Sequence, residues 1–423
     1  MSGWASFLQP LRQQGYRLLW LSSLTWYCAR WMDVLVTSWL ALQLTNSAFA
    51  VALIGFCRSI PVLLFGAFAG AIVDRLDRRQ LVIATTATNA LVSLGVGFLF
   101  LCGRLEFWHL AVASLLLGLS WSVEWPSRRA MIPDLAGKSQ LLPAIVLDTI
   151  AMNLNRVIGP LVGGGLLATL TIGDCFFVLA ALYGAGIAPL LLLRLPPVLK
   201  PQRTATLRFI LEGVGYCYRY KVVRGVLLVT VVMNAFFFPY SQLLAVMARD
   251  VLHVGPVELG IMASADGFGS LVGAVLVLSS ERFRRQGRVF AFGSFAMCLA
   301  LIAFAASPVY LLSLLCLLLS GVGHAAFSTY QSTIILREVG DALRARVMGV
   351  LTVAIGSSPP GMLFMGVVAG AHGAPWALGL SGALGALLVA ASVALAPSLM
   401  RYELPRARQM PPLPGTTFQG SRQ

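Results

Sequence analysis

Long apolar runs separated by short polar segments extend along almost the whole chain. Most runs contain about 20 or more predominantly apolar residues, the length that an α-helix needs to cross a bilayer. Apolar and polar residues do not alternate with period two, which argues against a membrane β-barrel. The pattern predicts an all-α integral membrane protein with twelve transmembrane helices, at residues 18–44, 48–73, 81–102, 108–127, 141–170, 174–193, 222–246, 256–280, 289–306, 309–333, 346–370 and 374–397.

The longest polar stretch between two predicted helices divides the chain into two halves of six helices each. The charged segment 74–78 is echoed at 281–285, 207 residues later, which indicates a duplicated unit and two pseudo-symmetric six-helix bundles. We expect an N-terminal bundle at 1–193, a cytoplasmic linker at 194–221, a C-terminal bundle at 222–397 and a disordered cytoplasmic tail at 398–423.

Composition and charge agree with a membrane protein. Hydrophobic residues make up 58% of the chain and charged residues 11%, whereas soluble domains carry roughly 25% charged residues. The net charge of +15 would also suit a protein that binds nucleic acid. With the N-terminus placed inside, however, 26 of the 31 Lys and Arg residues face the cytoplasm, and only Arg104 and Arg249 lie on the other side. This asymmetry predicts a multi-pass inner-membrane protein with both termini cytoplasmic and no nucleic-acid partner.

Motifs of soluble enzymes are missing from the sequence. The seven cysteines and four histidines are scattered singly, so we expect neither a metal site nor a cofactor. The chain has no Walker loop, no GxSxG segment and no HExxH segment. We therefore do not expect an enzyme.

Several segments resemble a known family of transporters. The loop after the second predicted helix, Gly70-x-x-x-Asp74-Arg75-x-x-Arg78-Arg79, resembles the signature loop of the major facilitator superfamily, with Asp77 where that loop usually has glycine. The segments WPSR at 125–128 and RARVMG at 344–349 resemble the branch that contains enterobactin and macrolide exporters. The resemblance implies a gating latch in which Asp74 is the central acid. The alternative is that these arginines only fix the topology.

The fifth predicted helix contains a second motif, GPLVGG at residues 159–164, which resembles the antiporter motif of the same superfamily. Pro160 removes a backbone donor and kinks a helix. Gly159, Gly163 and Gly164 allow neighbouring helices to approach closely. We expect a tight, bendable helix crossing between the halves, with a purely structural role as the alternative.

Charged residues inside predicted membrane helices are costly and by default functional. Arg30 and Asp33 have i,i+3 spacing on the first helix, so they are expected to pair. In the functional interpretation Asp33 takes up a proton and Arg30 holds an anionic substrate group; the alternative is a structural, self-neutralising pair. Glu124 and Arg128 are expected to form a local i,i+4 pair.

Four further intramembrane residues are candidates for substrate binding or proton coupling. Arg58 and Arg156 suit the capture of carboxylate or phenolate oxygens, or alternatively they satisfy helix-end carbonyls or Asp148. Asp266 lies on a face of small residues and is a candidate for the transport path. His324 titrates near neutral pH and is a candidate proton carrier, although a lone histidine is more often simply hydrogen-bonded.

These features favour a secondary active transporter that works by alternating access. The leading hypothesis is a monomeric, proton-coupled efflux pump in the lipid bilayer that exports a small amphiphilic or anionic compound, such as a siderophore or a drug. One alternative is an importer or facilitator of the same fold. Another is a membrane receptor or lipid-handling protein without transport activity.

The predicted topology can be tested with reporter fusions. Fusions at Asp77, Arg203 and Gln409 should report a cytoplasmic position, because these sites lie on the arginine-rich side. Fusions at Asn46 and Arg104 should report an external position. An external signal at Arg203 would contradict the twelve-helix arrangement.

Overall fold

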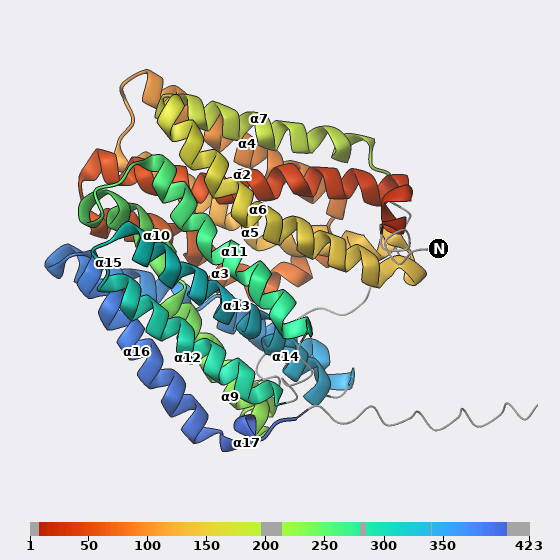
Figure 1. Ribbon diagram of the computed structural model, residues 1–423. Coiled ribbons are helices and arrows are strands. Elements are labelled where there is room, and N and C mark those ends of the chain that lie inside the picture. Colours follow the sequence, from red (N-terminus) through yellow and green to blue (C-terminus); the bar gives the residue numbers. More distant parts are fainter. Residues whose placement is uncertain (1–7, 196–213, 280–284, 340, 404–423) are drawn as a thin grey trace, which may run out of the picture.

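The computed structural model describes residues 8–195, 214–279, 285–339 and 341–403 (Figure 1). For residues 67–75, 138, 341–342 and 344–345 it describes the backbone only. The first part of the chain contains α2 (Gln14–Thr45), α3 (Ala48–Arg75), α4 (Arg78–Leu101), α5 (Phe107–Ala136), α6 (Leu141–Thr169) and α7 (Ile172–Leu192), with the short helices η1 (Gln9–Arg12) and η2 (Lys138–Gln140). The second part contains α9 (Lys221–Val232), η3 (Met233–Phe237), α10 (Tyr240–Val246), η4 (Met247–Val251), α11 (Pro256–Ser279), α12 (Gln286–Ala305), α13 (Tyr310–Glu338), α14 (Asp341–Ile355), α15 (Ser358–His372), α16 (Ala374–Leu395) and the short α17 (Pro397–Met400).

All twelve predicted membrane spans correspond to helices. In the described part of the chain, eleven helical segments are long and apolar enough to cross a membrane. The remaining span is α2, which has 32 residues but contains Arg30, Asp33 and several hydroxyl-bearing residues that lower its mean hydropathy. The prediction of an all-α membrane fold is confirmed.

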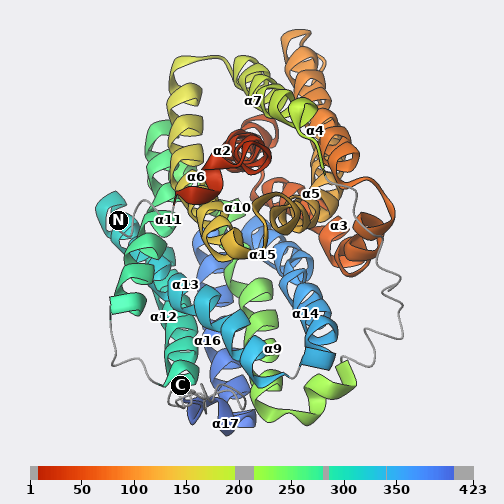
Figure 2. The same ribbon diagram turned by 90° about the vertical axis from the view of Figure 1, so that its right-hand side faces the viewer.

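The helices form two groups that meet along two main contacts. Helices α2 to α7 pack chiefly on one another, and α9, α12, α13 and α16 pack chiefly within the second group, as the end-on view in Figure 2 shows. The groups are joined mainly where α3 packs on α15 and α6 packs on α11. Most of the predicted linker at 194–221 and of the predicted tail at 398–423 lies outside the described residues, so these boundaries stay predictions.

The GPLVGG segment places α6 against a helix of each group. A Cβ atom on Gly159 would lie 2.7 Å from the Trp31 Cβ atom, so this glycine allows α6 to pack tightly on α2. On the other side, a Cβ atom on Gly164 would lie 2.5 Å from the Pro256 carbonyl oxygen, and one on Gly260 would lie 2.6 Å from the Pro160 carbonyl oxygen. The backbones of α6 and α11 are therefore in direct contact, as small residues permit.

Two of the spans are not continuous α-helices. The eleventh is interrupted at Gly356 and Ser357, and Pro359 lies in the first turn of α15, where its missing N–H costs no hydrogen bond. The seventh contains two π-helical segments, η3 and η4, on either side of α10. Each π turn widens the helix locally and is typical of functional positions.

The close contact between α6 and α11 leads to a prediction about the stability of the protein. We expect Gly164→Ala to lower the stability of the protein by about 1–3 kcal/mol, because the new methyl group meets a backbone carbonyl that cannot rotate away. The measurement is the apparent melting temperature of the purified protein in detergent. Gly165→Ala is the matched control, since nothing lies within 4 Å of the added atom there. Equal melting temperatures for the two variants would contradict the tight crossing.

Candidate functional site

The first buried ion pair joins α2 to α3. Arg58 Nη1 donates to Asp33 Oδ2 at 2.5 Å, and Thr37 Oγ1 donates to the other carboxylate oxygen at 3.0 Å. The two charged side chains are only 5% and 1% exposed. Gly118 of α5 lies directly against the Arg58 backbone, so α3 and α5 are in close backbone contact at this position. The expectation that Asp33 pairs with Arg30 is therefore wrong, because an arginine from the neighbouring helix reaches the carboxylate instead.

Arg30 contacts an aromatic ring in place of an acid. Its guanidinium carbon lies 4.8 Å from the ring centroid of Trp121 on α5, a cation–π distance. Its Nη1 atom is buried and makes no hydrogen bond within the described structure. A buried cation without an anionic partner is unfavourable, so Arg30 is a candidate for binding a negatively charged ligand.

Trp121 belongs to a larger stack of tryptophan and arginine side chains between α2 and α5. We call this set the tryptophan–arginine stack: Arg30, Trp121, Trp26, Arg128, Trp125 and Arg129. Trp121 is stacked on Trp26 with centroids 5.1 Å apart and on Trp125 with centroids 6.4 Å apart. Trp121 was not among the predicted site residues. The available signal was the i,i+4 spacing of Trp121, Trp125 and Arg129, which places these three side chains on one face of α5.

A second buried pair lies within α5 and is fully satisfied. Arg128 Nη2 donates to Glu124 Oε1 at 2.8 Å, which confirms the predicted i,i+4 pair. Thr86 and Asn89 of α4 donate to the two oxygens of Glu124 at 2.6 and 3.1 Å. Ser22 of α2 accepts a hydrogen bond from Arg128 at 3.0 Å. The hydrogen-bond partners in this cluster all belong to α2, α4 and α5, so the cluster connects three helices of the same group.

The third buried pair joins the two groups of helices. Arg156 of α6 donates through Nη2 to Asp266 Oδ2 of α11, and the same carboxylate oxygen lies 3.4 Å from Nδ1 of His324 on α13. Arg156 Nη1 lies 3.3 Å from Nε2 of His324. The second carboxylate oxygen of Asp266, Oδ1, is buried and has no hydrogen-bond partner among the described residues. We call these three residues the interhelical triad.

The structure separates Arg156 from Asp148, the acid that the sequence offered as its alternative partner. Asp148 accepts a hydrogen bond from Tyr27 at 3.3 Å and lies 3.7 Å from Arg129. Arg156 also lies over the ring of Trp31, with its guanidinium carbon 5.4 Å from the ring centroid.

A small cavity of about 70 Å³ borders the triad between the two groups. Its lining includes Arg156, Asp266, Trp31, Tyr240 and Ser38. A water molecule needs roughly 10–15 Å³ of such space. The cavity can therefore hold a few waters beside the triad but no substrate-sized molecule.

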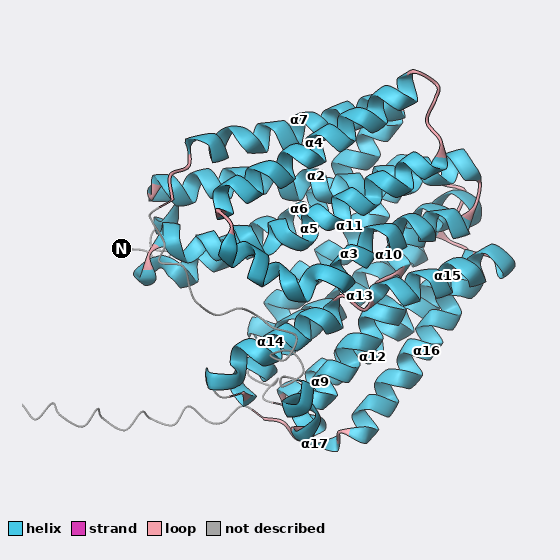
Figure 3. Cartoon of the chain, turned by 180° about the vertical axis from the view of Figure 1, so that it is seen from behind, coloured by secondary structure: helices cyan, strands magenta, loops and turns pink. Residues whose placement is uncertain are grey.

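The two groups are joined at one end and diverge at the other. At the joined end Arg249 of η4 donates to the Leu42 carbonyl at 3.1 Å and to Asn46 Oδ1 at 3.0 Å. The helices spread apart toward the end that carries η1 and α17, as Figures 1 and 3 show from opposite sides. The two groups are therefore held together by the α6–α11 and α3–α15 contacts, the triad and Arg249.

The signature loop is described only in part. The side chains of Gly70, Asp74 and Arg75 lie outside the described residues, so the predicted role of Asp74 stays a prediction. Arg78 bonds to Asp134 of α5 at 2.9 Å, and Arg79 donates to the carbonyls of Leu190 and Leu191 near the end of α7 at 2.8 and 2.7 Å. These contacts connect α4 to its neighbours in the same group.

Asp77 has a local structural role in this loop. Its carboxylate accepts from the backbone N–H groups of Arg79 and Gln80 at 2.9 and 3.1 Å and so caps the start of α4. Aspartate is among the favoured N-cap residues. This accounts for an aspartate where the resembled motif usually has glycine.

Comparison with known proteins identifies the family. Residues 5–416 match the model of the transmembrane secretion effector family, MFS_3. The chain is 23% identical to the staphyloferrin A transporter of Staphylococcus aureus, over 83% of this chain and 89% of that protein. It is 27% identical to the multidrug efflux pump Tap of Mycolicibacterium fortuitum, over 84% and 89%. It is 28% identical to the enterobactin exporter EntS of Shigella boydii, over 81% of each.

Solved structures agree on the fold. A bacterial homologue of the human lysosomal transporter Spinster, in an inward-facing and unoccupied conformation, superposes with a TM-score of 0.71 at 16% identity, over 93% of this chain and 99% of that one. A peptide transporter of the POT type superposes with a TM-score of 0.70 at 14% identity, over 91% and 95%. The motif-based assignment is confirmed: the chain belongs to the transmembrane secretion effector family of the major facilitator superfamily, and it is a membrane transporter, not an enzyme.

Proposed function

We propose that this protein exports small anionic or amphiphilic compounds across the inner membrane in exchange for protons, by alternating access. The names of its relatives, a staphyloferrin A transporter, an enterobactin exporter and a multidrug efflux pump, support export of a siderophore or drug. The observation that carries the proposal is the ion pair between Arg156 and Asp266, because it joins the two helix groups inside the membrane.

The distribution of basic residues gives the proposed orientation. Among the described residues, the diverging end carries arginines such as Arg288 beside α17 and Arg79 beside the end of α7. The positive-inside rule assigns the arginine-rich side to the cytoplasm. On this assignment the joined end, with Arg249 and Asn46, faces outward. The described helices then diverge toward the cytoplasm, the direction from which an exporter collects its substrate.

Alternation between inward-open and outward-open states requires the joined end to separate. Separation removes Arg156 from Asp266, and an unpaired carboxylate in a membrane interior is costly. A proton taken from the outside neutralises that carboxylate. When the groups close again, Arg156 pairs with Asp266 and favours its charged form. The proton then leaves Asp266 through the water-sized cavity and His324 toward the cytoplasm. Proton entry and substrate exit then alternate.

The earlier hypothesis, in which a proton on Asp33 frees Arg30, does not fit this geometry. Arg58 already forms an ion pair with Asp33, whereas Arg30 forms no ion pair with an acid among the described residues. We assign proton coupling to Asp266 with His324, and anion binding to Arg30. The ring of Trp121 beside Arg30 suits a substrate that combines negative charge with an aromatic or apolar body, such as a catecholate siderophore.

Asp266→Asn tests the coupling. The variant should lose most of the uptake into inside-out vesicles that is driven by a pH gradient, because an amide cannot take up the proton that Asp266 carries in the proposed cycle. Substrate exchange without a gradient should persist. Asp174→Asn, the same change at the loop-facing start of α7, is the matched control. Gradient-driven transport at the wild-type rate in correctly inserted Asp266→Asn would remove Asp266 from the mechanism.

Arg30→Gln tests the anion site. It should weaken binding of an anionic siderophore by roughly 30-fold, since losing the partner of a buried charge costs about 2 kcal/mol or more. The Kd is measured by isothermal titration of the purified protein, with the exposed Arg104→Gln as control. A permanently cationic dye that binds wild type more tightly than the siderophore would contradict an anion-selective site. Facilitated flux that ignores the proton gradient would favour the facilitator alternative.

A further inference from the structure

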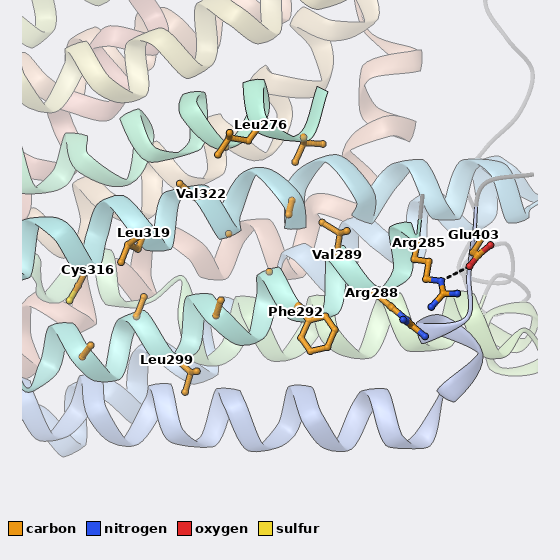
Figure 4. Close-up of a pocket in the computed structure, with 18 residues that line it drawn as sticks. Leu276, Arg285, Arg288, Val289, Phe292, Leu299, Cys316, Leu319, Val322 and Glu403 are labelled. Atoms are coloured by element: carbon orange, nitrogen blue, oxygen red, sulfur yellow. Dashed lines mark hydrogen bonds and ion pairs between the residues drawn. The ribbon is translucent and has the colours of Figure 1, made fainter. Parts of the chain in front are cut away.

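A large apolar groove lies on α11, α12 and α13, away from the interhelical triad. Its volume is about 1210 Å³, and it is lined by residues of these three helices and by Glu403. Both α11 and α12 pack against α13, so α13 forms the floor between them (Figure 4). None of the residues of the tryptophan–arginine stack or the triad lines this groove.

The floor is formed by small residues and the rim by large apolar ones. A Cβ atom on Gly323 of α13 would lie 2.8 Å from the Gly293 carbonyl oxygen, so α12 and α13 are in backbone contact and leave a trough above them. At the rim Phe292 is 61% exposed and Leu319 is 58% exposed. In a membrane-spanning region such exposed apolar surface is covered by lipid tails.

Only one end of the groove is charged. Figure 4 places Arg285, Arg288 and Glu403 together at that end, with Leu299 and Cys316 far from them. Arg285 pairs with Glu403 at 2.5 Å, and both side chains are about half exposed. Arg288 donates through Nε to the Met400 carbonyl at 3.2 Å and has no acidic partner among the described residues. Among the described residues, the mouth of the groove therefore has one arginine whose charge no acid balances.

We propose that this groove binds an anionic glycerophospholipid. Its phosphate interacts with the guanidinium of Arg288, with Arg285 beside it, and one acyl chain lies along the trough over Gly323 and Ala296. The positive charge at the mouth of the groove attracts an anionic headgroup more strongly than a zwitterionic headgroup. Basic pockets between transmembrane helices on the cytoplasmic side are typical sites for anionic lipid headgroups.

The site also touches the transport machinery through one helix. Gly323, in the floor of the groove, is followed directly by His324, which lies on the triad side of α13. A bound lipid would thus restrain the helix that carries His324. The binding proposal itself does not depend on which compound is transported or on proton coupling.

Native mass spectrometry of the purified full-length protein, titrated with phosphatidylglycerol or phosphatidylcholine, tests the proposal. Wild type should bind phosphatidylglycerol more tightly. Arg288→Gln should weaken that binding by about fivefold, the effect of one basic residue near an anionic lipid, and should leave phosphatidylcholine binding unchanged. Arg401→Gln is the matched control, because Arg401 is exposed near the same end but does not line the groove.

A second variant tests the trough. Ala296→Phe should reduce binding of both lipids by filling the space for the acyl chain, and because Ala296 is exposed the change should leave the melting temperature unaltered. Equal phosphatidylglycerol affinities for Arg288→Gln and Arg401→Gln would overturn the site. Displacement of phosphatidylglycerol by the siderophore would also overturn it, since the groove would then belong to the substrate path.

Discussion

A bilayer core contains no water to solvate a charged side chain, so a charge within it is costly unless the protein or a ligand neutralises it. This constraint organises the interior of the molecule. Each acid buried among the described membrane helices has an arginine nearby: Arg129 lies 3.7 Å from Asp148, and three acids form closer pairs, Asp33 with Arg58, Glu124 with Arg128, and Asp266 with Arg156. Two of these pairs lie within one helix group and are unaffected when the groups move relative to each other. The third pair crosses between the groups, so relative motion must break it.

The same constraint explains which parts of the structure could be predicted. Each span was recognisable because its apolar run has to match the thickness of the bilayer. The pair of Glu124 with Arg128 was predictable because four residues of one helix fix its geometry. The partners of Asp33 and Asp266 are 25 and 110 residues away, and the choice among them depends on which helices are neighbours. A single sequence contains no such information.

The helix interruptions also include one that the sequence indicates and others that it does not. The break in the eleventh span is followed by two consecutive prolines, Pro359 and Pro360, whose missing N–H groups have a local effect on any helix. The π segments η3 and η4 left no comparable mark. The seventh span is apolar on almost all sides. Its hydrophobic pattern therefore shows no shift that would reveal the additional residue of a π turn. The sequence therefore did not predict that Tyr240 lies between two π segments.

The contact of Gly164 with Gly260 has a consequence for the divergence of related sequences. Each helix offers a carbonyl oxygen to the α-carbon of the other, from Pro160 on one side and Pro256 on the other. When a large residue replaces a smaller one in an ordinary core, a neighbour can shrink to restore the fit. At this crossing both residues are already glycine, and the atoms that they contact belong to the main chain. No second-site substitution at this crossing can compensate for a change in the first, so the two glycines can be lost only together with the crossing itself.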